Sequence, residues 1–478
     1  MKYAWLVIGI FTARFLATAI AYPESDGDLA WQRWLGALIL RAHAIPRTLG
    51  TETFTAAGAP WVPQEWAFSI AAALGKSGAG WIVFAGGVAL AAGGALALSA
   101  LRAERLGASP RANALCTALA GVALFASFGV RAQVVAWPLL ALFLALLDLE
   151  SPLAYAAIAV AALWSNLHAS AMLAPLVAAA ATLGTILDEG VRGPNVRRRA
   201  TIAAACALAI CCNPFGVRLP LYALGLVFSP FKTAITEWKP TDLGDGSFAY
   251  GALPLLLLAL VFFSGPSARR ARDTIVLGAF AYLSLVATRN VALFGIVALP
   301  LAAAALSRHV AFFAADSGVA KAHRAARFVL PGVAALLAAV VALGLLQNES
   351  RSKDTVAANA IAHIARSNGE HRVFCADFAW CGLAVGLPHV RVFLDGRADP
   401  YPAGVWSDYL AIARLRHDWR EKLVNHRVDT IVTEKDDALD DALVRTRGWH
   451  ASYSDTTYRV WSIGAPPKSV VRAAGLSS

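Results

Sequence analysis

The sequence predicts an α-helical polytopic membrane protein with a small α/β domain at its C-terminal end, and two observations support this class. The 478 residues are 58% hydrophobic and only 15% charged, whereas soluble proteins carry about 25% charged residues. Charge is also unevenly distributed, since residues 1–347 hold 25 Lys/Arg and 15 Asp/Glu and residues 348–478 hold 17 and 16. The composition therefore separates a multi-span membrane domain, residues 1–347, from a water-soluble domain, residues 348–478.

The membrane domain contains about eleven apolar stretches near the length of a spanning helix, which needs about 20 residues. These stretches cover residues 3–21, 79–101, 112–129, 132–148, 152–165, 169–187, 200–213, 250–264, 274–288, 290–307 and 328–346. A signal peptide is the alternative for the first stretch, but Arg14 interrupts its apolar run and favours an uncleaved span.

The charges of the loops predict the orientation of the chain. If the N-terminus lies inside, the inner loops hold 14 Lys/Arg and 7 Asp/Glu, and the outer loops hold 8 of each once Lys76 is set aside. Lys and Arg are enriched on the cytoplasmic side of membrane proteins, so this bias predicts an inside N-terminus. An odd number of spans then makes the C-terminal domain extracytoplasmic.

The first outer loop, residues 22–76, has the composition of an interfacial segment. Residues 29–40 form an amphipathic stretch with Trp31 and Trp34, which predicts a helix lying on the membrane surface. A second interfacial piece begins at Trp61 and continues to about Lys76.

Three acids of this loop are candidate catalytic residues. Asp26 and Asp28 flank Gly27 just outside the first span, and Glu65 follows near the same surface. Two carboxylates so spaced can share a divalent cation or a proton, and either can act as a general base. The structural alternative is a helix start, with Asp28 as N-cap or first-turn acid beside Gly27 and with Glu65 capping a helix.

Other polar residues lie at the outer ends of spans. They are Arg131, Asn166, His168 and Arg289. Ionisable residues at membrane depth are costly, which makes them functional candidates. The alternatives are snorkelling to the headgroups and hydrogen bonds between helices. If Arg131 and Arg289 converge on one outer cavity, they can clamp a phosphate through paired hydrogen bonds.

The C-terminal domain alternates predicted strands with predicted helices, which indicates a small α/β layer domain. The strands are residues 373–374, 391–394, 429–433 and 458–461, and the helices are residues 357–367, 406–424 and 440–447. Asp395 and Arg397 follow a strand directly, so they either contact an acceptor or the membrane domain or pair with each other around a Gly turn. Cys375 and Cys381 can form a disulfide in an oxidising compartment.

Several of these segments together resemble a broad family of bacterial multi-span membrane proteins, and the layout is similar to the GT-C membrane glycosyltransferases. That class includes protein O-mannosyltransferases and lipid A aminoarabinose transferases. The resemblance rests on Asp26-Gly27-Asp28 with Trp31, Ile45-Pro46-Arg47, Trp61 to Trp66, Arg131-Ala132-Gln133, Trp164-Ser165-Asn166-Leu167-His168, Asn213-Pro214-Phe215-Gly216 and residues 393–399.

The resemblance implies an enzyme of the bacterial cytoplasmic (inner) membrane that takes a sugar from a polyprenyl-phosphate-type carrier on the outer side. The acceptor would be a lipid, a glycan or a protein. Asp26 or Asp28 would deprotonate the acceptor or help to hold a divalent cation, which is the one cofactor considered. Arg131 and Arg289 would grip the carrier phosphate, and Asn166, His168, Asp395 and Arg397 are further candidates for substrate binding.

The sequence also departs from the GT-C pattern. Many such enzymes carry a second acid in the second outer loop, where this chain has Arg131 and no acid, so Glu65 is the candidate substitute. A non-catalytic envelope protein that binds lipid or assists assembly on the same scaffold is therefore the alternative function. A transporter is disfavoured because acids are missing from the middle of the spans and no inverted repeat is evident. The positions of the basic residues also disfavour nucleic acid as a partner.

Overall fold

The computed structural model describes residues 2–22, 26–227, 234–242, 270–310, 312–313 and 357–464, together with residues 229 and 253. Its contacts divide the chain into two compact units. A helical unit comprises Met1–Tyr22, Ser77–Val227 and Ile235–Asn348, and a sheet unit comprises Pro23–Lys76, Phe228–Ala234 and Glu349–Ser478.

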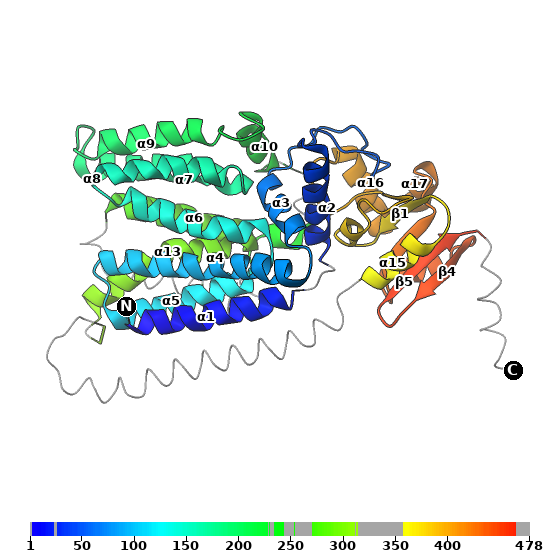
Figure 1. Cartoon of the computed structure of the whole chain (residues 1–478), viewed down its shortest axis with the longest axis horizontal. Coiled ribbons are helices and arrows are strands. Elements are labelled where there is room, and N and C mark those ends of the chain that lie inside the picture. Colours follow the sequence, from blue (N-terminus) through cyan, green and yellow to red (C-terminus); the bar gives the residue numbers. More distant parts are fainter. Residues whose placement is uncertain are drawn as a thin grey trace. The chain divides into compact units, whose positions relative to one another are not determined.

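The helical unit is a bundle of packed helices (Figure 1). Its helices are α1 (Lys2–Ile20), α4 (Gly78–Arg105), α5 (Pro110–Ala126), α6 (Ala132–Leu147), α7 (Ala156–Trp164), α8 (Leu173–Glu189), α9 (Val196–Ala209), α10 (Arg218–Val227), α12 (Ala271–Val286) and α13 (Val291–His309). Short 3₁₀ turns are η1 (Pro152–Tyr155), η2 (Ala169–Met172), η4 (Thr236–Trp238) and η7 (Thr288–Asn290). Helix α13 packs on α4, α5, α6 and α12, and all of residues 291–300 are buried.

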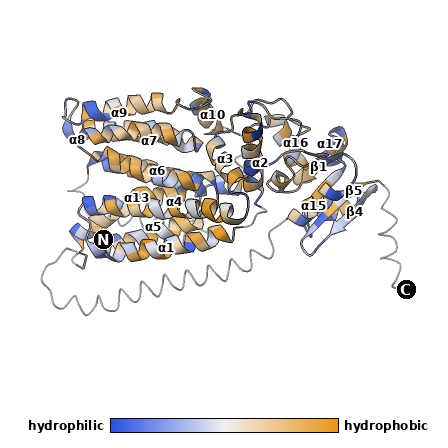
Figure 2. Cartoon of the chain, viewed as in Figure 1, coloured by the Kyte–Doolittle hydropathy of each residue, from blue (hydrophilic) through white to orange (hydrophobic). Residues whose placement is uncertain are grey.

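Four segments of this unit are long and apolar enough to cross a membrane. They are Tyr3–Ile20, Gly78–Arg105, Ala169–Glu189 and Thr288–His309, and shorter apolar helices cover Pro110–Ala126, Ala132–Leu147 and Pro152–Trp164. Figure 2 shows how strongly apolar residues dominate these helices. The predicted spans 250–264 (apart from Leu253) and 328–346 lie outside the described residues, so the total of about eleven remains a prediction.

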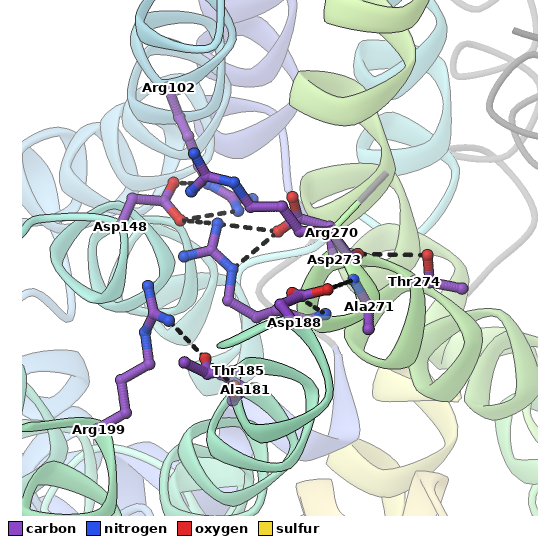
Figure 3. Close-up of polar contacts among 11 residues, drawn as sticks. Arg102, Asp148, Ala181, Thr185, Asp188, Arg199, Arg270, Ala271, Asp273 and Thr274 are labelled. Carbon is purple, nitrogen blue, oxygen red and sulfur yellow. Dashed lines mark hydrogen bonds and ion pairs between the residues drawn. The ribbon is translucent and has the colours of Figure 1, made fainter. Parts of the chain in front are cut away.

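Contacts gather the predicted inner loops at one end of the bundle. Asp148, which follows α6, accepts a hydrogen bond of 2.6 Å from Nε of Arg102 on α4 and forms an ion pair of 2.9 Å with Nη2 of Arg272 on α12 (Figure 3). Asp188 accepts a hydrogen bond of 2.6 Å from the backbone N–H of Ala271. These residues come from four loops that the charge pattern placed on one side, so the contacts agree with that grouping.

The sheet unit contains a five-stranded mixed sheet with the strand order β2-β1-β3-β5-β4. The strands are β1 (His371–Cys375), β2 (Val390–Val392), β3 (Thr430–Glu434), β4 (Trp449–Ser454) and β5 (Tyr458–Ile463). Strand β1 pairs in parallel with β2 and β3, whereas β5 is antiparallel to β3 and β4. The helices are α15 (Ala358–Arg366), α16 (Ala403–Ala413), α17 (Trp419–Asn425) and α18 (Ala438–Val444), with the 3₁₀ turn η8 (Trp380–Leu383).

The α/β character of this domain was predicted, but two elements differ from the prediction. Residues 406–424 form two helices, α16 and α17, because the chain turns at Leu415 with a φ of 50°. Strand β4 was not predicted, although its sequence Trp-His-Ala-Ser-Tyr-Ser alternates apolar or aromatic with polar side chains. It is an edge strand whose burial does not alternate, since residues 449–453 are half-buried and residue 454 is exposed. Cys375 and Cys381 form a disulfide.

The first outer loop packs within the sheet unit. It forms α2 (Gly27–Ala42) and α3 (Trp66–Leu74), which pack together. Between them, the backbone N–H of Val392 donates to the carbonyl of Glu52 over 2.8 Å, which extends the sheet beyond β2. The sequence grouped residues 22–76 with the membrane domain, whereas the contacts group residues 23–76 with the C-terminal domain. Backbone pairing across 340 residues leaves no local signal in the sequence.

Candidate functional site

The candidate acids lie at the start of α2, in the sheet unit. Asp26 is the N-cap residue, and its Oδ1 accepts a hydrogen bond of 2.9 Å from the backbone N–H of Leu29. This is the ordinary way to satisfy an N–H group of the first helical turn. The N-cap is therefore Asp26, and Asp28 is the first-turn acid that the structural alternative allowed.

Asp28 lies in the first turn of α2 and is half-buried. Its Oδ1 accepts a hydrogen bond of 3.3 Å from Nε1 of Trp31. The same oxygen lies against Gly396, since a Cβ atom at Gly396 would overlap it. Residue 396 belongs to the turn after β2, so Asp28 and the motif at 395–397 are brought together.

Glu65 precedes α3 and is joined to α2. Its Oε2 accepts a hydrogen bond from Nε2 of Gln32, and its Oε1 accepts one of 3.1 Å from Gln64. Gln32 lies one helical turn beyond Asp28, so both residues share a face of α2. No group of three His, Cys, Asp or Glu side chains that could hold a metal ion occurs among the described residues. We therefore derive no step through a cation.

Asp395 and Arg397 form a buried ion pair. Oδ2 of Asp395 accepts a hydrogen bond of 2.6 Å from Nη2 of Arg397 and one of 2.7 Å from the hydroxyl of Tyr401. Its Oδ1 accepts a hydrogen bond of 2.9 Å from Nε of Arg397. The two residues are 0% and 2% exposed. Burial alone would lower the pKa of Arg397, but the charge of Asp395 more than offsets this and raises it well above its ordinary value.

Arg397 also joins the C-terminal domain to the first outer loop. Its Nη1 donates to Oε1 of Glu52 over 2.7 Å. Its guanidinium lies over the rings of Trp34 and Trp61, 5.5 and 5.0 Å from their centroids, which is a favourable cation–π geometry. The pairing of Asp395 with Arg397 was the structural alternative to substrate contact, and the structure contains it.

Arg131 and Arg289 converge in the helical unit, as the phosphate-clamp hypothesis required. Arg131 is the N-cap residue of α6, and Arg289 lies in η7 before α13. Both reach the carboxylate of Glu237 in η4: Nη1 of Arg131 lies 3.1 Å from Oε2, and Nη1 of Arg289 lies 3.6 Å from Oε1. One carboxylate is thus shared by two guanidinium groups.

Two further contacts hold the guanidinium of Arg289 in place. Its Nη2 donates to Oε1 of Gln133 over 3.0 Å, and its guanidinium lies 4.7 Å from the centroid of the Trp238 ring. The backbone carbonyl of Glu237 accepts a hydrogen bond of 3.1 Å from the hydroxyl of Thr288. The side chains of Arg131, Arg289 and Glu237 are 33%, 20% and 34% exposed, so the cluster is accessible to a ligand.

His168 and Asn166 stabilise the same end of the bundle. His168 caps η2 by accepting a hydrogen bond of 3.1 Å from Ser170, and burial together with the charge of Arg289 lowers its pKa to about 3. It is therefore a neutral side chain. Nδ2 of Asn166 donates to the carbonyls of Ala162 and Cys212, each over 2.9 Å, which ties the ends of α7 and α9 together.

The structure adds three residues that the sequence did not single out: Glu237, Gln32 and Glu52. Glu237 stands in the short sequence Glu-Trp-Lys-Pro, and only its opposite charge to the two arginines offered a signal. Glu52 lies in a loop with no motif, and its partner is 345 residues away.

Comparison with solved structures finds three glycosyl-transferring proteins with a similar fold. The archaeal oligosaccharyltransferase AglB from Archaeoglobus fulgidus, solved with an inhibitory peptide and a dolichol-phosphate, gives a TM-score of 0.61 at 12% identity over 97% of this chain and 74% of its own. ArnT from Cupriavidus metallidurans, bound to undecaprenyl phosphate, gives 0.56 at 16% identity over 97% and 98%. Arabinofuranosyltransferase AftD from Mycobacteria gives 0.54 at 17% identity over 96% and 40%.

These structural neighbours are GT-C glycosyltransferases, so the chain has the GT-C fold that its motifs resemble. The helical unit of this chain has four helical segments long and apolar enough to cross a membrane, among the residues that the structure describes. No protein-family model matches the sequence, and the search of curated proteins finds no similar sequence.

Proposed function

We propose that the protein is a glycosyltransferase that moves a sugar from a polyprenyl-phosphate-type donor to an envelope acceptor on the outer side of the bacterial cytoplasmic membrane. The observation that carries the proposal is the convergence of Arg131 and Arg289 on the single carboxylate of Glu237. The structural likeness to an ArnT bound to undecaprenyl phosphate supports the choice of carrier.

A carboxylate and a phosphate present similar oxygen acceptors to guanidinium groups. Arg131 and Arg289 already hold such an acceptor, and their side chains are one-third and one-fifth exposed. A carrier phosphate would take the place of Glu237 between them. Arg289 is oriented by Gln133 and Trp238, so its guanidinium would meet the phosphate with little loss of side-chain freedom.

In the proposed reaction, the acceptor hydroxyl attacks the anomeric carbon of the sugar. The bond between that carbon and the phosphate oxygen breaks, and the polyprenyl phosphate leaves with the bonding electrons. The hydroxyl proton passes to a carboxylate, for which we propose Asp28. Arg131 and Arg289 stabilise the charge that grows on the leaving phosphate.

Asp28 is preferred over Asp26 and Glu65 as the base. Asp26 holds the first turn of α2 through its capping hydrogen bond, and Glu65 accepts hydrogen bonds from Gln32 and Gln64. Asp28 instead accepts a hydrogen bond of 3.3 Å from Nε1 of Trp31, and its Oδ1 lies against Gly396 of the turn after β2. The divalent cation and the inside position of the N-terminus are also parts of the proposal. The proposal names the sugar and the acceptor by chemical class only.

The experiment compares Asp28→Asn and Asp26→Asn in membrane vesicles supplied with a panel of undecaprenyl-phosphate-linked monosaccharides. Release of undecaprenyl phosphate is measured. Asn is as good an N-cap as Asp and keeps an oxygen that accepts hydrogen bonds, so both variants should fold. We expect Asp28→Asn to lower turnover at least 100-fold, since general-base catalysis contributes about 10²–10⁴-fold.

The matched control is Arg131→Gln combined with Arg289→Gln, which should weaken binding of undecaprenyl phosphate. Full turnover in Asp28→Asn would exclude this residue as the base. Binding of the carrier without any turnover of the panel by the unchanged protein would favour the alternative, a non-catalytic envelope protein that binds lipid or assists assembly.

A further inference from the structure

We propose that the turn Asp395-Gly396-Arg397 of the C-terminal domain is a positioning element that sets the orientation of the Asp28 carboxylate. The inference deepens the proposed function and depends on it for the role of Asp28 as the base. It concerns residues of the sheet unit only.

Gly396 provides the direct contact. A Cβ atom at this position would overlap Oδ1 of Asp28 and would lie 3.2 Å from Nε1 of Trp31, the group that donates to the same oxygen. The φ of Gly396 is not in the left-handed region, so backbone conformation does not require glycine here. The absence of a side chain instead allows the carboxylate to lie directly on the turn.

The turn itself is rigid. Oδ1 of Asp395 accepts hydrogen bonds from both the backbone N–H and Nε of Arg397, at 3.0 and 2.9 Å, and Oδ2 accepts from Tyr401. Both charged side chains are buried, and buried charges that lose a partner are costly. A fixed turn is a suitable support for a group that needs a defined geometry.

The same turn holds α2 at a second position. Arg397 lies over the ring of Trp34, which is six residues after Asp28 on that helix, and it forms an ion pair with Glu52 of the same loop. Residues 395–397 therefore contact α2 at two positions, Asp28 in its first turn and Trp34 further along the helix.

The other side of the Asp28 segment is also closely packed. A Cβ atom at Gly27 would overlap the carbonyl oxygen of Ala379, and one at Gly382 would overlap the carbonyl of Gly27. Both partners belong to the segment around η8, where Cys381 is linked to Cys375. The backbone at Gly27 thus contacts the η8 segment, whereas the side chain of Asp28 contacts the turn at 395–397, and the two contacts together fix where its carboxylate lies.

The test uses Gly396→Ala in the full-length protein. We expect kcat to fall about tenfold or more while KM for the carrier-linked sugar changes less than about twofold, because small displacements of a reacting group affect the chemical step. The control is Gly404→Ala in α16, where an added Cβ meets no atom within 4 Å and the wild-type values should persist. Equal kcat in the two variants would overturn the proposal.

A double-mutant cycle separates positioning from general damage. In the Asp28→Asn background, Gly396→Ala should cause little further loss of kcat, because the base is already absent. A loss of the same factor in both backgrounds would overturn the proposal. If Asp28→Asn alone keeps full turnover, the assigned base is wrong. The contact between Gly396 and Asp28 is then tested by stability, because Gly396→Ala should lower the melting temperature less in the Asp28→Ala background than in the wild type.

Trp31→Phe provides a second variant in case Gly396→Ala does not fold. It keeps an aromatic ring and removes the N–H that donates to Asp28. Loss of a hydrogen bond to the charged form raises the pKa of a carboxylate, so the acidic limb of the kcat–pH profile should move to higher pH. An unchanged profile would argue against the role of this contact.

Discussion

The guanidinium of Arg397 donates a hydrogen bond to the carboxylate of Glu52 over 2.7 Å, although 345 residues separate them in the chain. The Arg397 side chain is fully buried and that of Glu52 is 10% exposed. The pair joins the first outer loop to the C-terminal domain, so the loop that carries the candidate acids is part of the sheet unit.

We expect Arg397→Ala to lower the free energy of unfolding of the sheet unit by about 3–5 kcal/mol, because Asp395 and Glu52 would remain buried without their cation. The measurement is thermal unfolding of the purified protein. The control is Arg391→Ala, whose pair with Glu370 has side chains 45% and 64% exposed and should contribute less than about 1 kcal/mol. Equal effects of the two variants would contradict the buried pairing.

The pH dependence of stability should include a contribution from Asp408. Burial by itself raises the pKa of this carboxyl, but hydrogen bonds from Lys422 and His426 more than offset it, so the folded pKa lies below the ordinary 3.8. The stabilisation is therefore complete above pH 3.8 and is lost as the pH falls through the lowered folded value.

Asp408→Asn tests this sign. The variant should be less stable than the wild type near neutral pH, and the difference should shrink as the pH falls below 4, because the wild-type carboxylate then becomes protonated. Melting temperatures between pH 3 and pH 7 provide the measurement. A constant difference over this range would show that the charge of Asp408 is not responsible.

The inner-loop cluster of the helical unit should depend on Asp148. This residue pairs with Arg102 and Arg272, which are 5% and 3% exposed. Asp148→Asn leaves both guanidinium groups with less compensating charge, so we expect a loss of about 3–5 kcal/mol. Thermal unfolding in detergent is the measurement, and Glu189→Gln, at an exposed position bonded to Asn195, is the control with a small expected effect.

Local patterns in the sequence predicted what is local in the structure. The amphipathic stretch at 29–40 is part of α2, Asp28 lies in its first turn, and most strands of the C-terminal domain follow their apolar runs. The pairing of Glu52 with β2 was not predicted, because it depends on a neighbour distant in sequence. Strand β4 was also not predicted, although its partner β5 follows it directly in the chain. Membrane-surface packing was the natural interpretation of the apolar face of α2, whereas Leu29, Leu35 and Ile39 are buried within the protein.

In the candidate site, too, the sequence indicated some residues and missed others. Arg131 and Arg289 were found because charge at the end of an apolar span is rare, and their convergence was a stated hypothesis. Glu237 was not identified, since an acid in a long outer loop is unremarkable until its partners are known. Its position between the two arginines is a property of the folded bundle.

Glu237 should compete with the carrier phosphate for Arg131 and Arg289. Glu237→Gln removes the charge and nearly keeps the shape, so the two guanidinium groups would be more available to a phosphate. We expect the Kd for undecaprenyl phosphate to fall by up to about fivefold, which corresponds to the loss of a competing ion pair of about 1 kcal/mol at a partly exposed position. Direct binding to the purified protein is the measurement.

The control is Glu150→Gln, which removes one negative charge from a predicted inner loop and should leave the Kd unchanged. The Arg131→Gln and Arg289→Gln variants should each raise the Kd, because the phosphate then loses one of its two cations. Weaker binding in Glu237→Gln would instead mean that this carboxylate orders the arginines for the ligand, since Arg289 would lose an interaction that fixes its guanidinium beside Gln133 and Trp238. The direction of the change therefore decides whether Glu237 competes with the phosphate or helps to bind it.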